Sequence, residues 1–126
     1  LNSVCGCSAR VGRPGALLSL FNEVVPDELA TLFAGMEKEA VAHFRQKYLP
    51  GLTPSSPNIA IFKNGNLLHI LHRHQIESSS AQQISDALSE VYDGICTKNN
   101  SEDAKEKLRG VFIENYQADP LNLPTQ

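Results

Sequence analysis

Two of the three cysteines in this 126-residue chain, Cys5 and Cys7, are separated by a single glycine and stand just before a predicted helix. Thiolates are nucleophiles and metal ligands, and the unpaired N–H groups at a helix N-terminus favour the thiolate. Cys5 is expected at the strand-to-helix turn, where access is good, and Cys7 in the first turn, close enough to attack a sulfur bonded to Cys5. Gly6 leaves room for a bound partner and lets the backbone turn sharply. A disulfide between Cys5 and Cys7 would close a small ring that is strained and easily reduced, so the motif indicates thiol–disulfide exchange. The alternative is that both cysteines are buried or bind a metal.

Two arginines follow the cysteines within the first two turns of this helix. Arg10 and Arg13 can each lower the pKa of a cysteine or hold an anionic thiol substrate with a guanidinium group. The alternative, for at least one of them, is an ordinary solvated arginine. Gly6, Arg10 and Arg13 are therefore candidate substrate-binding residues.

Composition limits the classes of protein that this chain can represent. Hydrophobic residues make up 41% and charged residues 20%, which is typical of one globular domain. The formal net charge of -3 offers no basic surface for nucleic acid or an anionic membrane, and no apolar run approaches the ~20 residues of a transmembrane helix. The odd cysteine count favours a reducing compartment, and Cys96 is expected to be a small hydrophobe rather than a third redox partner. With no signal-type segment visible, the sequence predicts a cytoplasmic protein without nucleic-acid or membrane partners.

The hydrophobic pattern predicts alternating helices and strands. Apolar residues at helical spacing predict helices over 8–22, 37–48, 78–95 and 102–116, the first of them disrupted early by Pro14. Short apolar runs predict strands over 29–33, 58–62 and 67–72, with a further strand just before Cys5. Asn64-Gly65 predicts a tight hairpin turn between the last two strands. The segments expected to be loops are 24–28, 49–57 and 97–101, and 118–126 is expected to be loose.

This order of elements is that of an α/β protein in which helices cover both faces of a mixed β-sheet. It is the layout of a thioredoxin-like fold, in which the thiol turn lies beside a loop that ends in a cis-proline before a strand. Pro57 occupies that position, and a trans loop proline is the alternative because cis is the minority state. Opposite Cys5, the peptide at Ser56 would hydrogen-bond an extended substrate. Ser56 and Pro57 are therefore candidate substrate-binding residues.

Four groups of residues, in sequence order, carry a resemblance to a known family. They are Asn2-Ser3-Val4-Cys5-Gly6-Cys7 with Arg13-Pro14, Phe33-Ala34-Gly35 with Lys38-Glu39-Ala40, Pro54-Ser55-Ser56-Pro57, and Arg73-His74-x-Ile76-Glu77. Together they resemble the bacilliredoxin family from Leu1 to about Cys96. The resemblance implies a thioredoxin-like domain at 1–96, and it leaves 97–126 as a C-terminal extension with a further helix. The strand before Cys5 is nearly absent, as if truncated, and the segment after Cys96 is longer than the family pattern.

The resemblance also implies a function, a thiol–disulfide oxidoreductase that removes bacillithiol, a low-molecular-weight thiol, from mixed disulfides on proteins. Cys5 would be the attacking thiolate and Cys7 the resolving cysteine. Bacillithiol would be the thiol co-substrate, with no bound cofactor and no metal. The partners would be S-bacillithiolated client proteins, and a low-molecular-weight thiol or a disulfide reductase would recycle the protein.

Three other functions use parts of the same sequence. General disulfide reduction or isomerisation would use the same residues. Metal binding would combine Cys5 and Cys7 with histidines, of which alternation places His72 and His74 on one face and His69 on the other. Solvated or strand-end histidines are the simpler interpretation of these three. A thioredoxin-like interaction module would keep the scaffold without turnover.

Overall fold

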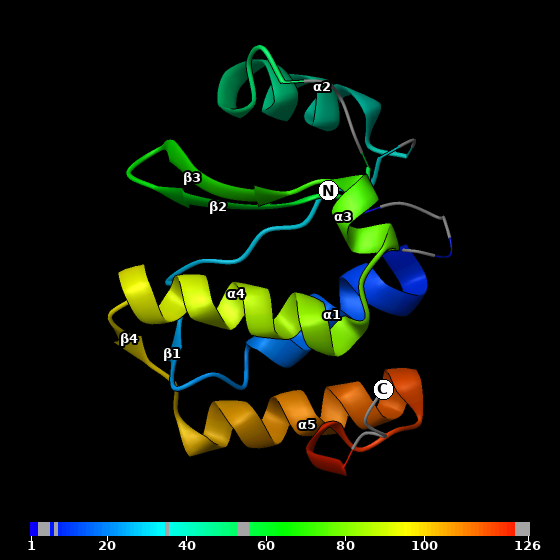
Figure 1. Cartoon of the computed structure of the whole chain (residues 1–126), viewed down its shortest axis with the longest axis vertical. Helices are drawn as coiled ribbons and strands as arrows, with labels where there is room; N and C mark the ends of the chain where they lie inside the picture. The colour runs from blue at the N-terminus through cyan, green and yellow to red at the C-terminus, as the bar shows by residue number, and fades with distance from the viewer. Residues whose placement is uncertain (3–5, 7, 35, 53–55, 123–126) are drawn as a thin grey trace.

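The computed structural model describes residues 1–2, 6, 8–34, 36–52 and 56–122. In chain order its elements are a π-helix η1 (Ser8–Gly12), α1 (Arg13–Ser19), β1 (Val24–Val25), α2 (Lys38–Tyr48), β2 (Ile59–Lys63), β3 (Asn66–Leu71), α3 (Arg73–Glu77), α4 (Ala81–Ile95), β4 (Lys98–Asn99), α5 (Glu102–Tyr116) and a 3-10 helix η2 (Pro120–Asn122). Figure 1 shows them in layers, with α2 on one side of the β2–β3 hairpin, α4 and α1 on the other, and α5 beyond them. The chain is a mixed α/β structure, as predicted. Its described strands form two separate two-stranded antiparallel sheets rather than the single mixed sheet that we expected.

The β2–β3 hairpin forms where the sequence predicts it. Asn64 and Gly65 both have positive φ values, 54° and 79°, which is the backbone geometry that a tight two-residue turn requires. Ile59 pairs with Leu71 at the far end of the hairpin, and the register shifts between Ile61 and Phe62. The predicted strands 58–62 and 67–72 are therefore confirmed, each within one residue of its observed bounds.

The two faces of the hairpin pack against different helices. On one face the Phe62 ring lies 5.9 Å from the Phe44 ring and 5.5 Å from the Tyr48 ring of α2, centroid to centroid. On the other face, Ile59 and Ile61 pack against the main core. Alternate residues of a strand point to opposite sides, so a five-residue strand is enough to join the two layers.

The main core lies between the hairpin, α3 and α4, with η1 and β1 at its margin. Its buried members are Leu71, Ile76, Ile84, Leu88 and Tyr92. Helix α4 supplies three of them, of which Ile84 and Leu88 belong to the apolar stripe that the sequence predicts and Tyr92 does not. The sequence offers the serines 78–80 as N-caps for this helix, and the structure uses Ser80, whose hydroxyl accepts a hydrogen bond from the Gln83 N–H at 3.1 Å.

Helix α1 confirms the disruption expected from Pro14. Residues 8–12 form a π-helix, and regular α-helix begins only at Arg13, which places Pro14 in the first turn. The helix ends at Ser19, earlier than the predicted Asn22. Ser19 is fully buried, and its hydroxyl lies 3.0 Å from the Tyr92 hydroxyl of α4.

Two of the predictions about loops and strands were wrong. Val24–Val25 is not a loop, because it pairs with Lys98–Asn99, which the sequence presents as a polar linker. The stretch 29–33 is not a buried strand, because Leu29 is 66% exposed and only Phe33 is bridged to another segment, in parallel to Asn2. An apolar run becomes a strand only where a partner lies alongside, and within the described residues this stretch has one rung of a ladder.

The C-terminal segment packs against the rest of the chain. Helix α5 has the predicted bounds 102–116, and Phe112 on it is only 2% exposed. The predicted loose tail is wrong for residues 119–122, because the Arg109 guanidinium donates two hydrogen bonds to Asp119 at 3.1 and 2.6 Å and η2 follows. Residues 123–126 lie outside the described part. Among the described residues, none of the helices is long and apolar enough to cross a membrane.

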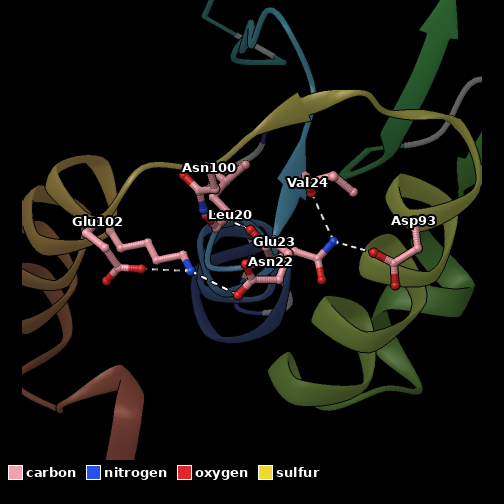
Figure 2. A network of polar contacts seen from close by, with 8 residues as sticks. Leu20, Asn22, Glu23, Val24, Asp93, Asn100 and Glu102 are labelled. Atoms are coloured by element: carbon pink, nitrogen blue, oxygen red, sulfur yellow. Dashed lines mark hydrogen bonds and ion pairs between the residues drawn. The ribbon is translucent and has the colours of Figure 1, made fainter.

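Asn100 links this segment to the end of α1. Its side-chain amide donates to the carbonyl oxygens of Leu20 at 2.6 Å and Asn22 at 2.9 Å, as Figure 2 shows. Asn22 in turn donates to the Asp93 carboxylate of α4 at 2.8 Å. The polar contacts in Figure 2 therefore join α1, α4 and the segment before α5.

Candidate thiol–disulfide site

The predicted nucleophile and resolving cysteine, Cys5 and Cys7, lie outside the described residues. Gly6 between them is helical and exposed, and the helical backbone continues from residue 8. The Arg10 guanidinium carbon would lie 3.9 Å from a Cβ atom placed on Gly6. A positive charge is therefore held beside the glycine of the motif, where it favours a nearby thiolate or an anionic ligand.

Arg13, the other predicted substrate-binding arginine, has a partner within the protein. Its Nη1 donates to the Asn2 Oδ1 atom at 3.1 Å, and the Ser8 hydroxyl donates to the same oxygen. Ser8 is 1% exposed. Neither Asn2, which belongs to the family motif, nor Ser8 was a candidate site residue from the sequence, and the available signal was their position on either side of the cysteines.

The Ser56–Pro57 peptide bond is cis, as the sequence analysis expected. Pro57 is buried and Ser56 is half-buried. Arg73 Nη1 lies 3.4 Å from the Ser56 carbonyl oxygen, to which it donates, and the Arg73 guanidinium also pairs with Glu77. Arg73 begins α3, a short helix that the sequence analysis did not predict and that contacts η1.

The backbone sets the first residue of the chain beside the residue that follows Pro57. The Leu1 nitrogen donates to the Asn58 carbonyl oxygen at 2.8 Å, and the Asn58 N–H donates to the Leu1 carbonyl oxygen at 3.0 Å. Leu1 lies four residues before Cys5 in the sequence, and Asn58 directly follows Pro57. Figure 1 shows the N-terminus beside the start of β2 and close to α3.

The histidines do not form a metal site with one another. Within the described part of the chain, no group of three or more histidine, cysteine or acidic side chains is arranged to hold a metal ion. The His72 and His74 rings lie parallel with centroids 6.0 Å apart. The His69 Nε2 atom is buried without a hydrogen-bond partner among the described residues.

Cys96 behaves as the small hydrophobe that we expected. It follows the last turn of α4 and packs against the main core. Burial, together with the negative charges of Asp27 and Asp93, raises the pKa of the Cys96 thiol and so disfavours its nucleophilic form. The candidate chemistry therefore stays with the N-terminal motif.

Comparison with known proteins agrees with the sequence motifs. A family model described as disulphide isomerase matches residues 1–96. The chain is 52% identical over 93 residues to a bacilliredoxin of Cytophaga hutchinsonii, a match that covers 74% of this chain and 68% of the relative. It is 44% identical to a bacilliredoxin of Halalkalibacterium halodurans and 41% identical to one of Staphylococcus aureus, each over 96 residues, 76% of this chain and 66% of the relative.

The family matches place the chain among redox enzymes of thiol–disulfide chemistry. The chain belongs to the bacilliredoxin family. It spans about two thirds of the length of the curated relatives that it matches. Residues 97–126, which include β4 and α5, lie beyond the family match.

Proposed function

We propose that this chain is a thiol–disulfide oxidoreductase that removes bacillithiol from mixed disulfides on client proteins. The observation that carries the proposal is the backbone pairing of Leu1 with Asn58, which sets the segment leading to Cys5 beside the segment that follows Pro57. A nucleophilic thiol and a peptide able to hold an extended substrate would then lie on the same side of the fold. Membership in the bacilliredoxin family supports the choice of substrate.

The same contacts support a thioredoxin-like arrangement. Asn2 is bridged in parallel to Phe33, through bonds of 2.7 Å from its N–H to Leu32 and 2.8 Å from the Ala34 N–H to its carbonyl. On its other side the N-terminal segment exchanges two hydrogen bonds with Asn58, as antiparallel strands do. Side by side, the segments follow the order residue 33, residues 1–2, β2 and β3. The first pair is parallel, and each of the next two pairs is antiparallel. This is the mixed order that a thioredoxin-like sheet requires.

The proposed reaction is two successive thiol–disulfide exchanges. The Cys5 thiolate attacks the bacillithiol sulfur of the modified client, a Cys5–bacillithiol disulfide forms, and the client leaves as a thiolate that takes up a proton. The Cys7 thiolate then attacks the Cys5 sulfur and releases bacillithiol, which leaves a Cys5–Cys7 disulfide. An external thiol or a disulfide reductase then supplies the two electrons that restore both thiols. Alternatively, the external thiol or reductase displaces bacillithiol from Cys5 directly, without a Cys5–Cys7 disulfide.

Arg10 is the side chain best placed to assist this reaction. Its guanidinium lies beside Gly6, so it would stabilise the attacking thiolate or receive an anionic group of the thiol co-substrate. Arg13 would act less directly, because it already donates to Asn2. The proposal needs no bound metal or cofactor, and it places the protein in the reducing cytoplasm among bacillithiolated clients.

The test is intact-mass analysis after mixing the reduced protein with a bacillithiolated client. Wild type, Cys5→Ser and Cys7→Ser are compared side by side. We expect wild type to release the client, Cys7→Ser to release it and retain the bacillithiol adduct, and Cys5→Ser to do neither. If all three variants leave the client modified, the proposed reaction is wrong.

General disulfide isomerisation is the second candidate, because the matching family model is described as disulphide isomerase. It would use the same Cys5 attack on a protein disulfide. A client with scrambled disulfides separates the two functions, since an isomerase restores the native pairing while a de-bacillithiolase leaves it scrambled. Loss of folding stability on adding a chelator would point instead to metal binding, and an unreactive Cys5 to an interaction module.

A further inference from the structure

The Asn2 side chain joins the two flanks of the thiol motif. Asn2 precedes the motif, and its Oδ1 atom accepts hydrogen bonds from Ser8, directly after the motif, and from Arg13 one turn further on. The Asn2 backbone is itself fixed, since its N–H and carbonyl are both bonded to the segment 32–34. The side chain therefore extends from an anchored point to the helix that follows the cysteines.

The groups that meet at Asn2 are not surface side chains in loose contact. Ser8 is 1% exposed and Arg13 is half-buried. A hydrogen bond made by a buried hydroxyl is costly to break, and hydrogen bonds from charged donors are the stronger ones. These contacts are therefore strong enough to fix the separation of the two flanks.

We infer that Asn2 is a positioning residue for the thiol segment, by which we mean the chain between Asn2 and Ser8. Through Ser8 and Arg13, Asn2 holds the two ends of that segment together and so keeps Arg10 beside Gly6. Its relevance to catalysis rests on the proposed function, whereas the contacts stand by themselves. The charged groups on the described elements that follow or contact this region are Arg10 on η1, Arg13 on α1, and Arg73, His74 and Glu77 on α3, which contacts η1. Three of these five groups are arginines and one is a carboxylate, so a cysteine kept near them would have a larger thiolate fraction than one kept away from them.

The experiment measures the pH dependence of alkylation. Reduced protein is treated with iodoacetamide across the pH range, and the peptide containing Cys5 and Cys7 is followed by mass spectrometry, with the Cys96 peptide as an internal control. The variants are Asn2→Ala, Ser8→Ala and the double variant. Asn115→Ala is the matched control, because among the described residues the Asn115 side chain bonds within its own helix, to the Val111 carbonyl. Client release is measured on the same samples.

We expect Asn2→Ala to move the alkylation midpoint of the Cys5–Cys7 peptide upward by about half a unit or more, which slows alkylation near neutral pH about threefold. Ser8→Ala should shift the midpoint in the same direction. The double variant should shift the midpoint no further than Asn2→Ala does, because the two substitutions remove the same Ser8–Asn2 contact. Client release should slow in parallel near neutral pH and recover at higher pH.

An unchanged midpoint in Asn2→Ala and Ser8→Ala would overturn the inference, whatever happens to folding stability, because a merely structural contact would lower stability without moving the midpoint. Additive shifts in the double variant would also overturn it. If the midpoints shift as expected while wild type releases no client, the positioning role stands and the proposed function fails.

Discussion

Gly15 of α1 lies directly against Ile84 of α4. A Cβ atom placed on Gly15 would come within 2.7 Å of the Ile84 Cβ atom and within 3.0 Å of the Ala81 carbonyl oxygen. The two helices are therefore as close as a missing side chain allows. In the sequence Gly15 is only a poor helix former, and the packing explains why glycine occupies that position.

Replacing Gly15 should separate these helices. We expect Gly15→Ala to lower the free energy of unfolding by about 1–3 kcal/mol, because the added methyl group overpacks the core. Chemical denaturation followed by circular dichroism measures the change. Gly110→Ala in α5 is the matched control, since an added Cβ there meets no described atom within 4 Å. The control should gain about 0.5–1 kcal/mol from helix propensity alone. A Gly15→Ala protein as stable as wild type would contradict the close packing.

The buried hydroxyl pair Ser19–Tyr92 predicts a stability loss in alkali. Burial raises the pKa of Tyr92 above its ordinary value of 10.0, so the folded state keeps this proton more tightly than the unfolded state. The resulting stability is fully present below about pH 10 and is lost as the pH rises from there through the folded pKa. Tyr92→Phe should cost about 1 kcal/mol at neutral pH, because a hydrogen bond is lost, and should show a smaller alkaline loss than wild type. Urea unfolding at a series of pH values tests this, and identical alkaline losses in both proteins would refute it.

Asn100 should determine how firmly the C-terminal segment is attached. Asn100→Ala removes two hydrogen bonds to the carbonyls of Leu20 and Asn22 and should lower stability by about 1–3 kcal/mol. It should also speed limited proteolysis within residues 97–122. Asn99→Ala, one residue earlier and exposed, should stay within about 0.5 kcal/mol of wild type. Equal effects of the two substitutions would show that the side-chain contacts in Figure 2 are not the cause.

Replacing His69 with an apolar residue should raise the free energy of unfolding. Its Nε2 atom is buried with no partner in the described part of the chain, and such an atom costs about 1–3 kcal/mol. His69→Leu should therefore raise the free energy of unfolding by about 1 kcal/mol. His43→Leu on the exposed surface of α2 is the control and should change little. A destabilised His69→Leu protein would mean that the imidazole makes a contact beyond those described.

Local chemistry made much of the fold predictable from the sequence. Asn64 and Gly65 favour positive φ, so the hairpin could be placed from two residues. Ser80 caps α4 through its own hydroxyl, and Ser101 caps α5 in the same way with a bond of 3.0 Å from the Ala104 N–H. Each of these signals lies within four residues of the structure that it determines.

Long-range pairing and short elements were not predictable in this way. Val24–Val25 has strand-forming residues, but its partner Lys98–Asn99 carries no hydrophobic pattern. Helix α3 has five residues, too few to show a helical period, and its N-cap is His72, which is not a usual capping residue. Neither element has a local signature.

The candidate site divides in the same manner. Cys5, Gly6 and Cys7 were named from residue type and spacing, and their roles remain predictions. Arg10 was named from its nearness in sequence, and the structure places it beside Gly6. Asn2 was quoted from the sequence only as part of the family motif, because its contacts with Ser8 and Arg13 form across the motif only in the folded chain.

The β1–β4 ribbon joins Val24–Val25 to Lys98–Asn99, and residues 26–96 of the matched domain lie between them in the sequence. Bringing such distant segments together requires closure of a long loop, which is entropically unfavourable until the intervening chain has collapsed. The ribbon and α5 should therefore assemble last and detach first. Hydrogen exchange should show this as faster exchange of the α5 amides than of the α4 amides, with the main core remaining folded while the C-terminal segment opens and closes.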